Sequence, residues 1–165
     1  MKIYFTGPCG KRIEPITGLL PERDEHGGLW YKVGKDISSH FHIVYPGDDV
    51  VREQIAREGL GEDQRIYLRS AYGMVEDTQF LLQAPKPDER MHPINRRIVV
   101  VAKRNPFLYK LSATDPSYEN VPSGEEATIT TGSIVSFCGL EFIFHAERPM
   151  PEPPPQTYKK IQLKI

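Results

Sequence analysis

Two histidines separated by one residue are the strongest candidates for chemistry in this sequence. His40 and His42 stand in a stretch of strand-forming residues. Side chains two positions apart lie on the same face of a strand, which is the arrangement that two adjacent metal ligands need. Together with the nearby carboxylate of Asp48 they form one candidate metal site, and a metal-dependent enzyme is one interpretation. The competing interpretation is a strand that carries both histidines on its outer face.

The opening residues, MKIYFTGPCGKR, resemble a strand that runs into a phosphate-binding loop. Such a loop requires a glycine, four residues and then Gly-Lys-Ser/Thr, so that backbone amides wrap the phosphate and the hydroxyl holds magnesium. Phe5 stands where the first glycine is required, and Arg12 replaces the hydroxyl residue. We therefore predict a turn here. Since no complete catalytic set can be assigned elsewhere, we expect a protein that is not an enzyme and needs no cofactor.

Composition narrows the classes of partner. The chain has 165 residues and a formal net charge of −1, without a run of lysine or arginine that would attract nucleic acid or an anionic membrane. No apolar segment approaches the ~20 residues that span a bilayer. Two distant cysteines and the lack of an apolar signal core at the N-terminus favour the cytoplasm, or a particle assembled there. We expect a soluble chain with protein partners and no small-molecule substrate.

The clearest structural signal lies between residues 97 and 145. Apolar runs separated by turn-forming residues predict short strands at residues 98–101, 107–111, 127–131, 134–137 and 140–144. A short polar turn joins the first two strands, which predicts a hairpin, and residues 112–124 are predicted to be a loop. Several short strands at this spacing indicate a mainly β protein with an antiparallel β-sandwich.

Elements outside this segment are fewer. Residues 48–60 are predicted to form one short amphipathic helix, with an aspartate as N-cap and Gly59 as its C-terminal stop. Strands are also predicted at residues 29–33, 66–68 and 78–82. Long loops rich in proline and glycine connect the rest, including residues 84–95.

The C-terminal residues suggest an assembly arm. Residues 149–155 are proline-rich and predict an extended spacer, after which residues 157–165 alternate like a strand. Such a strand cannot satisfy its own backbone hydrogen bonds, so it must add to a sheet edge of its own domain or of a neighbour. In the second case the partner-binding residues are Tyr158, Ile161, Leu163 and Ile165.

The segment after residue 106 resembles the C-terminal half of the forkhead-associated (FHA) domain. In that family a strand pair is followed by a polar loop, a turn that ends in glycine and a final pair of strands. The matching residues are Phe107 to Leu111, the loop from Asp115 to Gly124, and Gly132-Ser133-Ile134 followed by Phe137, Gly139, Phe142 and Phe144. The resemblance implies an FHA-like sandwich.

The phosphothreonine-reading motifs of that family are degenerate here. They comprise a Gly-Arg in an early loop, a Ser-x-x-His and an Asn-Gly in a later loop. The sequence has Asn95-Arg96-Arg97-Ile98 at the place of the second motif and Ser123-Gly124 at the place of the third. A different assignment uses Ser39-x-x-His42 with Gly34-Lys35 upstream, and it requires a very large insertion before the following strands.

These observations lead to three functional hypotheses. The first is a non-catalytic structural or scaffold subunit of a larger assembly, such as a phage particle or a secretion-type machine, that contacts other subunits or its own copies. The second is a phosphopeptide-binding FHA module that uses Arg96, Arg97, Lys103 and Arg104. The third is the metal-dependent enzyme.

We predict an N-terminal extension at residues 1–60, an FHA-like sandwich at 61–148 and an arm at 149–165.

Overall fold

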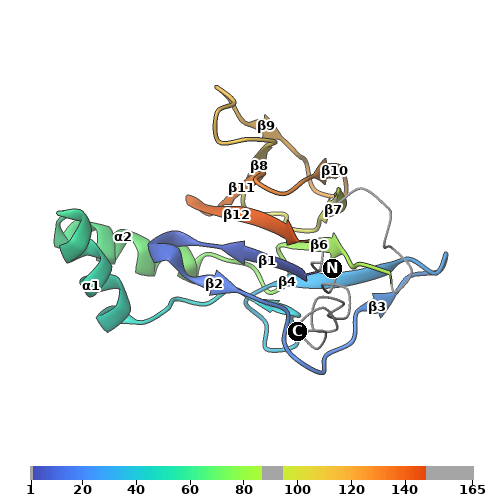
Figure 1. The fold of residues 1–165 in the computed structure, drawn as a ribbon, viewed down its shortest axis with the longest axis horizontal. Helices are drawn as coiled ribbons and strands as arrows, with labels where there is room; N and C mark the ends of the chain where they lie inside the picture. Colours follow the sequence, from blue (N-terminus) through green and yellow to red (C-terminus); the bar gives the residue numbers. More distant parts are fainter. Residues whose placement is uncertain (1, 87–94, 148–165) are drawn as a thin grey trace, which may run out of the picture.

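The computed structural model describes residues 2–86 and 95–147, which form a mainly β sandwich with a helical hairpin at one end (Figure 1). Neighbouring strands follow the order β2-β1-β12-β11-β8-β9 in the first sheet and β10-β7-β6-β4-β3 in the second. All pairs are antiparallel except β5, which pairs in parallel with β4. The predicted fold class, a mainly β antiparallel sandwich, is confirmed.

Six strands make each sheet. The first sheet contains β1 (Lys2–Thr6), β2 (Arg12–Ile13), β8 (Phe107–Lys110), β9 (Glu119–Asn120), β11 (Ile134–Phe137) and β12 (Leu140–Glu147). The second contains β3 (Glu22–Arg23), β4 (Leu29–Gly34), β5 (Phe41–His42), β6 (Phe80–Gln83), β7 (Arg96–Val100) and β10 (Glu126–Ile129). A 3-10 turn, η1 (Pro8–Gly10), and two helices, α1 (Asp48–Glu58) and α2 (Glu62–Gly73), complete the described elements.

The final hairpin follows the sequence pattern closely. Alternate residues of β12, among them Phe142 and Phe144, are buried. The turn between β11 and β12 consists of Cys138 and Gly139, whose φ angles are 56° and 77°. Two consecutive positive φ angles are typical of a two-residue hairpin turn that matches the twist of the strands.

The hairpin predicted at residues 98–101 and 107–111 is wrong. β7 pairs with β6 and β10 in one sheet, whereas β8 pairs with β9 and β11 in the other. The polar turn between them carries the chain from one sheet to the other. Val100 and Phe107 at its two ends are both buried, so the pattern of an apolar strand, a polar turn and an apolar strand holds for a crossover as well as for a hairpin.

The strand predicted at residues 66–68 is also wrong, because these residues lie inside α2. Gly61 precedes the helix as its N-cap, and Glu62 and Asp63 place negative charge in its first turn, where the helix dipole favours it. Leu68 and Tyr72, four residues apart, face the core. The helical spacing of apolar residues along the twelve residues of α2 therefore decides the structure here, although a few of these residues individually prefer strands.

The strands between residues 2 and 42 are part of the sandwich and do not form an extension to it. β1 and β2 belong to the first sheet, and β3, β4 and β5 belong to the second. β1 pairs with β12 along its whole length, from Lys2 opposite Glu147 to Thr6 opposite Ile143. The boundary predicted at residue 60 therefore cuts through a single core.

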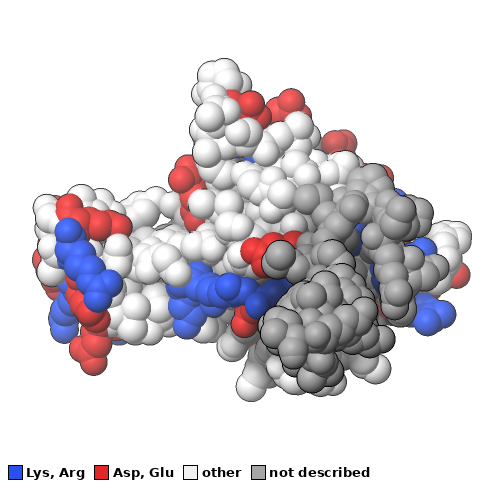
Figure 2. Space-filling view, viewed as in Figure 1, with Lys and Arg blue, Asp and Glu red and all other residues white. Residues whose placement is uncertain are grey.

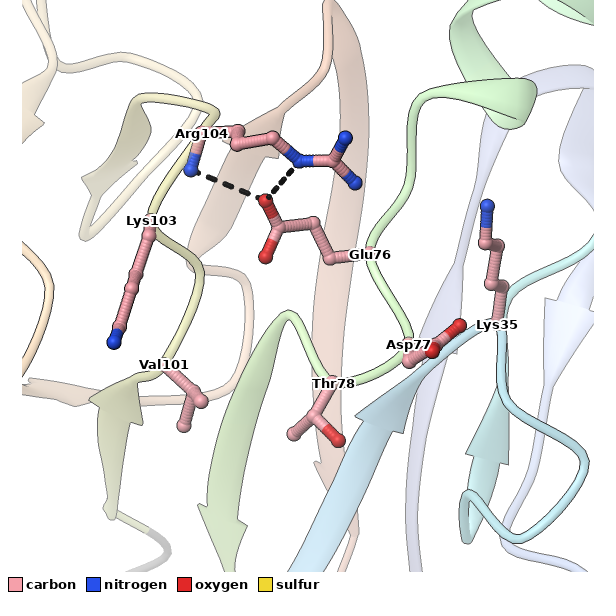
Figure 3. A pocket seen from close by; sticks show the side chains of 7 residues that line it. All are labelled: Lys35, Glu76, Asp77, Thr78, Val101, Lys103 and Arg104. Carbon is pink, nitrogen blue, oxygen red and sulfur yellow. Dashed lines mark hydrogen bonds and ion pairs between the residues drawn. The ribbon is translucent and has the colours of Figure 1, made fainter.

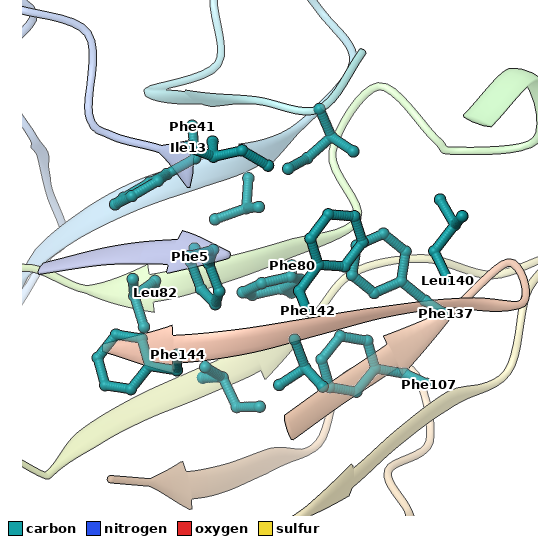
Figure 4. Packing of buried hydrophobic residues seen from close by; sticks show 14 of the residues in the cluster. Phe5, Ile13, Phe41, Phe80, Leu82, Phe107, Phe137, Leu140, Phe142 and Phe144 are labelled. Atoms are coloured by element: carbon teal, nitrogen blue, oxygen red, sulfur yellow. The ribbon is translucent and has the colours of Figure 1, made fainter. Parts of the chain in front are cut away.

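Phenylalanine side chains fill the space between the sheets (Figure 4). Phe80 of β6 lies in edge-to-face contact with rings from the opposite sheet, with centroid distances of 5.9 Å to Phe5, 5.1 Å to Phe107 and 5.9 Å to Phe137. Edge-to-face contacts at these separations add to the free energy gained by burying the rings. The core therefore has an aromatic centre that joins the two sheets.

The helical hairpin closes one end of the sandwich. Tyr72 of α2 packs edge-to-face on Phe142, with the ring centroids 6.5 Å apart, and the Tyr67 hydroxyl donates to the backbone oxygen of Gly139 at 2.9 Å. Figure 2 shows acidic and basic side chains intermixed on the hairpin, in agreement with the ion pairs Arg57–Glu53 and Arg65–Glu62. Among the residues that the structure describes, no helix is long and apolar enough to cross a membrane.

Candidate functional site

An open cleft lies where three loops meet at one end of the sandwich. Its volume is about 610 Å³. One loop follows β4, one precedes β6 and one follows β7. They supply the lining residues Lys35, Glu76, Asp77, Thr78, Val101, Lys103 and Arg104 (Figure 3).

The first two loops are held together by backbone contacts. The amide of Lys35 donates to the carbonyl oxygen of Glu76 at 3.1 Å, and the amide of Asp36 donates to that of Asp77 at 3.3 Å. Gly34 makes this approach possible, since a Cβ atom there would lie 2.0 Å from the Asp77 backbone oxygen. The conformation of this wall is thus set by main chain, and does not depend on flexible side chains.

Buried Gln79 connects the third loop to the other two. Its amide donates to the carbonyl oxygen of Val33 at 2.8 Å, and its own carbonyl oxygen accepts from the amides of Val101 and Ala102 at 3.2 and 3.1 Å. The side-chain amide of Asn105 donates to the Met74 carbonyl oxygen at 2.9 Å. All three cleft loops are therefore fixed relative to one another.

Glu76 and Arg104 form the principal charged contact in the cleft. One carboxylate oxygen of Glu76 accepts from the Arg104 backbone amide at 3.1 Å and from Nε of the same residue at 3.2 Å. Burial by itself raises the pKa of Glu76, but hydrogen bonds from the Arg104 amide and guanidinium and from the Lys103 amide lower this pKa overall. The carboxylate is therefore ionised at neutral pH.

Two lysines flank this pair. Lys35 and Lys103 come from different loops and lie on opposite sides of Glu76 and Asp77 in Figure 3. The lining carries three basic side chains and two carboxylates, so the cleft has a small excess of positive charge. Arg104 is paired with Glu76, and the two lysines supply the other basic side chains of the lining.

The four residues predicted to bind phosphate are divided by the structure. Lys103 and Arg104 line the cleft, but Arg96 and Arg97 lie at the opposite end of β7. Arg96 is buried, and the Arg97 guanidinium lies over the ring of Trp30, 5.3 Å from its centroid. The two arginines therefore lie away from the cleft, because β7, a strand of five residues, carries them at its far end.

The predicted metal ligands do not form a metal site. His40 is buried, and its ring is used by the backbone: Nδ1 accepts from the Lys32 amide at 2.9 Å, so Nε2 carries the proton and donates to the Leu20 oxygen at 2.7 Å. His42 is bonded separately, to the Lys35 oxygen at 2.9 Å. The alternative that both histidines lie on the outer face of a strand is wrong for His40, which is buried and precedes β5.

Asp48 is engaged elsewhere. It accepts a hydrogen bond from the Tyr45 hydroxyl at 2.9 Å and pairs with Arg65 at 3.1 Å. The Tyr45 hydroxyl and the nearby arginines lower the pKa of this carboxyl. In the part of the chain that the structure describes, no three or more His, Cys, Asp or Glu side chains form a group that could hold a metal ion.

The cleft contains residues that the sequence did not mark as a site. Glu76 and Asp77 belong to no recognised motif, and the available signal was an acidic pair directly before the strand predicted at residues 78–82. Gly34-Lys35 does lie at the cleft, while the Ser39 hydroxyl donates to the Asp77 backbone oxygen at 3.3 Å and is buried. The predicted partner-binding residues Tyr158, Ile161, Leu163 and Ile165 lie outside the described residues.

Comparisons with known proteins give a limited result. No protein-family model matches the sequence, and no curated protein matches it. Among solved structures, the chain is similar to the crystal structure of the FHA domain of human APLF in complex with an XRCC1 bisphospho peptide. The alignment covers 89% of this chain and all of that chain, with a TM-score of 0.47 and 11% sequence identity.

Proposed function

We propose that the chain is a non-catalytic protein-interaction module whose loop-end cleft binds an acidic segment of a partner protein. The supporting observation is the convergence of Lys35 and Lys103, from separate loops, on one open cleft. A volume of about 610 Å³ is within the range of ligand-binding clefts in proteins. Lysine ammonium groups on flexible stems can follow carboxylates along an extended peptide.

The first prediction concerns these two lysines. A library of random displayed peptides selected on the purified protein should yield sequences enriched in Asp and Glu. Replacement of both cleft lysines, Lys35→Glu with Lys103→Glu, should weaken binding of the selected peptides at least about tenfold, because attraction becomes repulsion between like charges. Fluorescence anisotropy with labelled peptides measures this change.

The matched control is Lys11→Glu with Arg23→Glu, which changes the net charge equally at two exposed positions outside the cleft. The control should bind the selected peptides as the unaltered protein does. Selected peptides without acidic enrichment, or equal weakening by both double variants, would contradict the proposal.

We further propose that the module serves as a structural subunit of a larger assembly, of the kind found in phage particles or secretion-type machines, with residues 149–165 as the connecting arm. The arm needs a sheet edge with free backbone groups. Among the described strands at the sheet edges, β10 has four residues, whereas β2, β3, β5 and β9 have two each. β10 of a neighbouring copy therefore offers the arm the longest edge.

The second prediction tests this arm. The full-length chain should be oligomeric by light scattering across a range of concentrations, and a form ending at Arg148 should be monomeric. Circular dichroism of the shortened form should retain the β-sheet spectrum, since every described strand ends before that residue. Monomers in both cases, or equal oligomers in both, would show that the arm does not link copies of the chain.

A phosphopeptide reader is the alternative function. The observation that favours it is the set of donors at Lys103 and Arg104, where backbone amides and a guanidinium point at one anion. Titration with a phosphothreonine peptide and its unphosphorylated form separates the alternatives. Equal affinity for the two peptides would remove this one.

A further inference from the structure

We infer that Glu76 is an internal ligand of an oxyanion site formed by residues 103 and 104, so that this site is closed to phosphate in the unaltered chain. The inference deepens the proposed function by specifying a partner segment that is not phosphorylated. That part rests on the proposed function, whereas the oxyanion site does not depend on it.

The donors around the carboxylate are those that hold phosphate or sulfate in proteins. The Arg104 amide and Nε converge on a single oxygen of Glu76, at 3.1 and 3.2 Å, and the Lys103 amide helps to lower the pKa of this carboxyl. Successive backbone amides together with an arginine fork form a cradle for an oxyanion. In this chain a carboxylate of the protein itself fills the cradle.

The position of Glu76 distinguishes it from an ordinary surface ion pair. Its side chain is 16% exposed, although that of Arg104 is 80% exposed. Its own backbone is fixed on both sides, since its amide donates to the Gln79 side-chain oxygen at 3.2 Å and its carbonyl oxygen accepts from the Lys35 amide. A tethered carboxylate held in place has a high effective concentration, which a free anion must overcome.

Removal of the carboxylate should open the site. The Glu76→Ala variant keeps the backbone contacts of residue 76 and leaves the Arg104 donors without their acceptor. The exposed Arg104 guanidinium and the neighbouring backbone amides can then bind an anion from solution. The Glu53→Ala variant is the control, because it removes a carboxylate that pairs with Arg57 on the exposed side of α1.

The experiment is a titration of the labelled full chain with inorganic phosphate at constant ionic strength, followed by the amide resonances of Lys103 and Arg104. The Glu76→Ala protein should show saturable shifts, whereas the unaltered protein and the Glu53→Ala control should show none over the same range of phosphate concentration. Adding Arg104→Ala to the Glu76→Ala variant should abolish saturation.

Three results would overturn the inference. They are saturable phosphate binding at residues 103 and 104 in the unaltered chain, a folded Glu76→Ala protein that does not respond, and tighter binding of a phosphothreonine peptide than of its unphosphorylated form. The first and third need no variant, so the inference stays testable if Glu76→Ala fails to fold. Phosphate binding by Glu76→Ala without acidic-peptide binding by the unaltered chain would keep the oxyanion site and overturn the proposed partner.

Discussion

Replacing Phe80 by alanine is expected to lower the free energy of unfolding by about 3–5 kcal/mol. The ring is 1% exposed and stands at the centre of the aromatic core. It belongs to β6, but its ring contacts are with Phe5, Phe107 and Phe137 of the opposite sheet. Truncation removes the contacts that hold the two sheets together and leaves a cavity that rigid strands cannot close.

Urea unfolding monitored by Trp30 fluorescence and by circular dichroism measures the effect. The control is Ile37→Ala, because Ile37 is 84% exposed and its truncation should change the unfolding free energy by no more than about 0.5 kcal/mol. A Phe80→Ala loss below about 1 kcal/mol would mean that the site collapses around the missing ring, contrary to close packing of this core.

The Gly34→Ala variant is expected to lose about 1–3 kcal/mol and to loosen the cleft. A Cβ atom at this position would lie 2.0 Å from the oxygen and 2.6 Å from the carbon of the Asp77 carbonyl. Both are backbone atoms, so no side-chain rotation relieves the clash. The loops that carry Lys35 and Glu76 must move apart, and the two backbone hydrogen bonds between them lengthen.

Gly73→Ala is the matched control, and it should change the stability in the opposite direction. Gly73 is the last residue of α2, and a Cβ atom there meets nothing within 4 Å. Alanine should raise stability by up to about 1 kcal/mol, because it favours the helix more than glycine does. Urea unfolding measures both changes, and faster hydrogen exchange at the Lys35 and Asp36 amides should appear in Gly34→Ala alone. Unchanged exchange there would show that the clash is absorbed elsewhere.

Local patterns in the sequence were sufficient for the strands that pack one face on the core. Leu140, Phe142 and Phe144 alternate with outward residues, and β11 was predicted with its observed bounds. Gly59 correctly marked the end of α1, where it adopts a left-handed conformation with φ of 69°. In each case the sequence signal lies within a few neighbouring residues, and the same residues take the predicted buried or turn positions in the structure.

Pairing between strands could not be predicted in the same way. The turn after Val100 shows where β7 ends but not which sheet receives the next strand. α2 was missed because Ile66 and Tyr67 favour strands, although the helix buries its other face against the sandwich. The order of strands depends on contacts between distant residues, which no local pattern contains.

The candidate site was predicted only in part for the same reason. Lys103 and Arg104 were identified, but their neighbours Lys35 and Glu76 come from loops tens of residues away in sequence. The convergence depends on the close approach at Gly34 and on the hydrogen bonds of Gln79. Conversely, His40 and His42 suggested a metal site, but the fold uses the His40 ring for hydrogen bonds with the backbone.

The pairing of β1 with β12 has a consequence for how this chain folds during synthesis. Residues 2–6 leave the ribosome about 140 residues before their partners, residues 143–147. Until then the first sheet exists as two separate parts, β2-β1 and β11-β8-β9, because β12 is the strand between them. Pairing over so long a sequence separation is slow and leaves apolar strands exposed in the meantime. We therefore expect the second sheet to form first on the ribosome, and the nascent chain to depend on chaperones until β12 emerges.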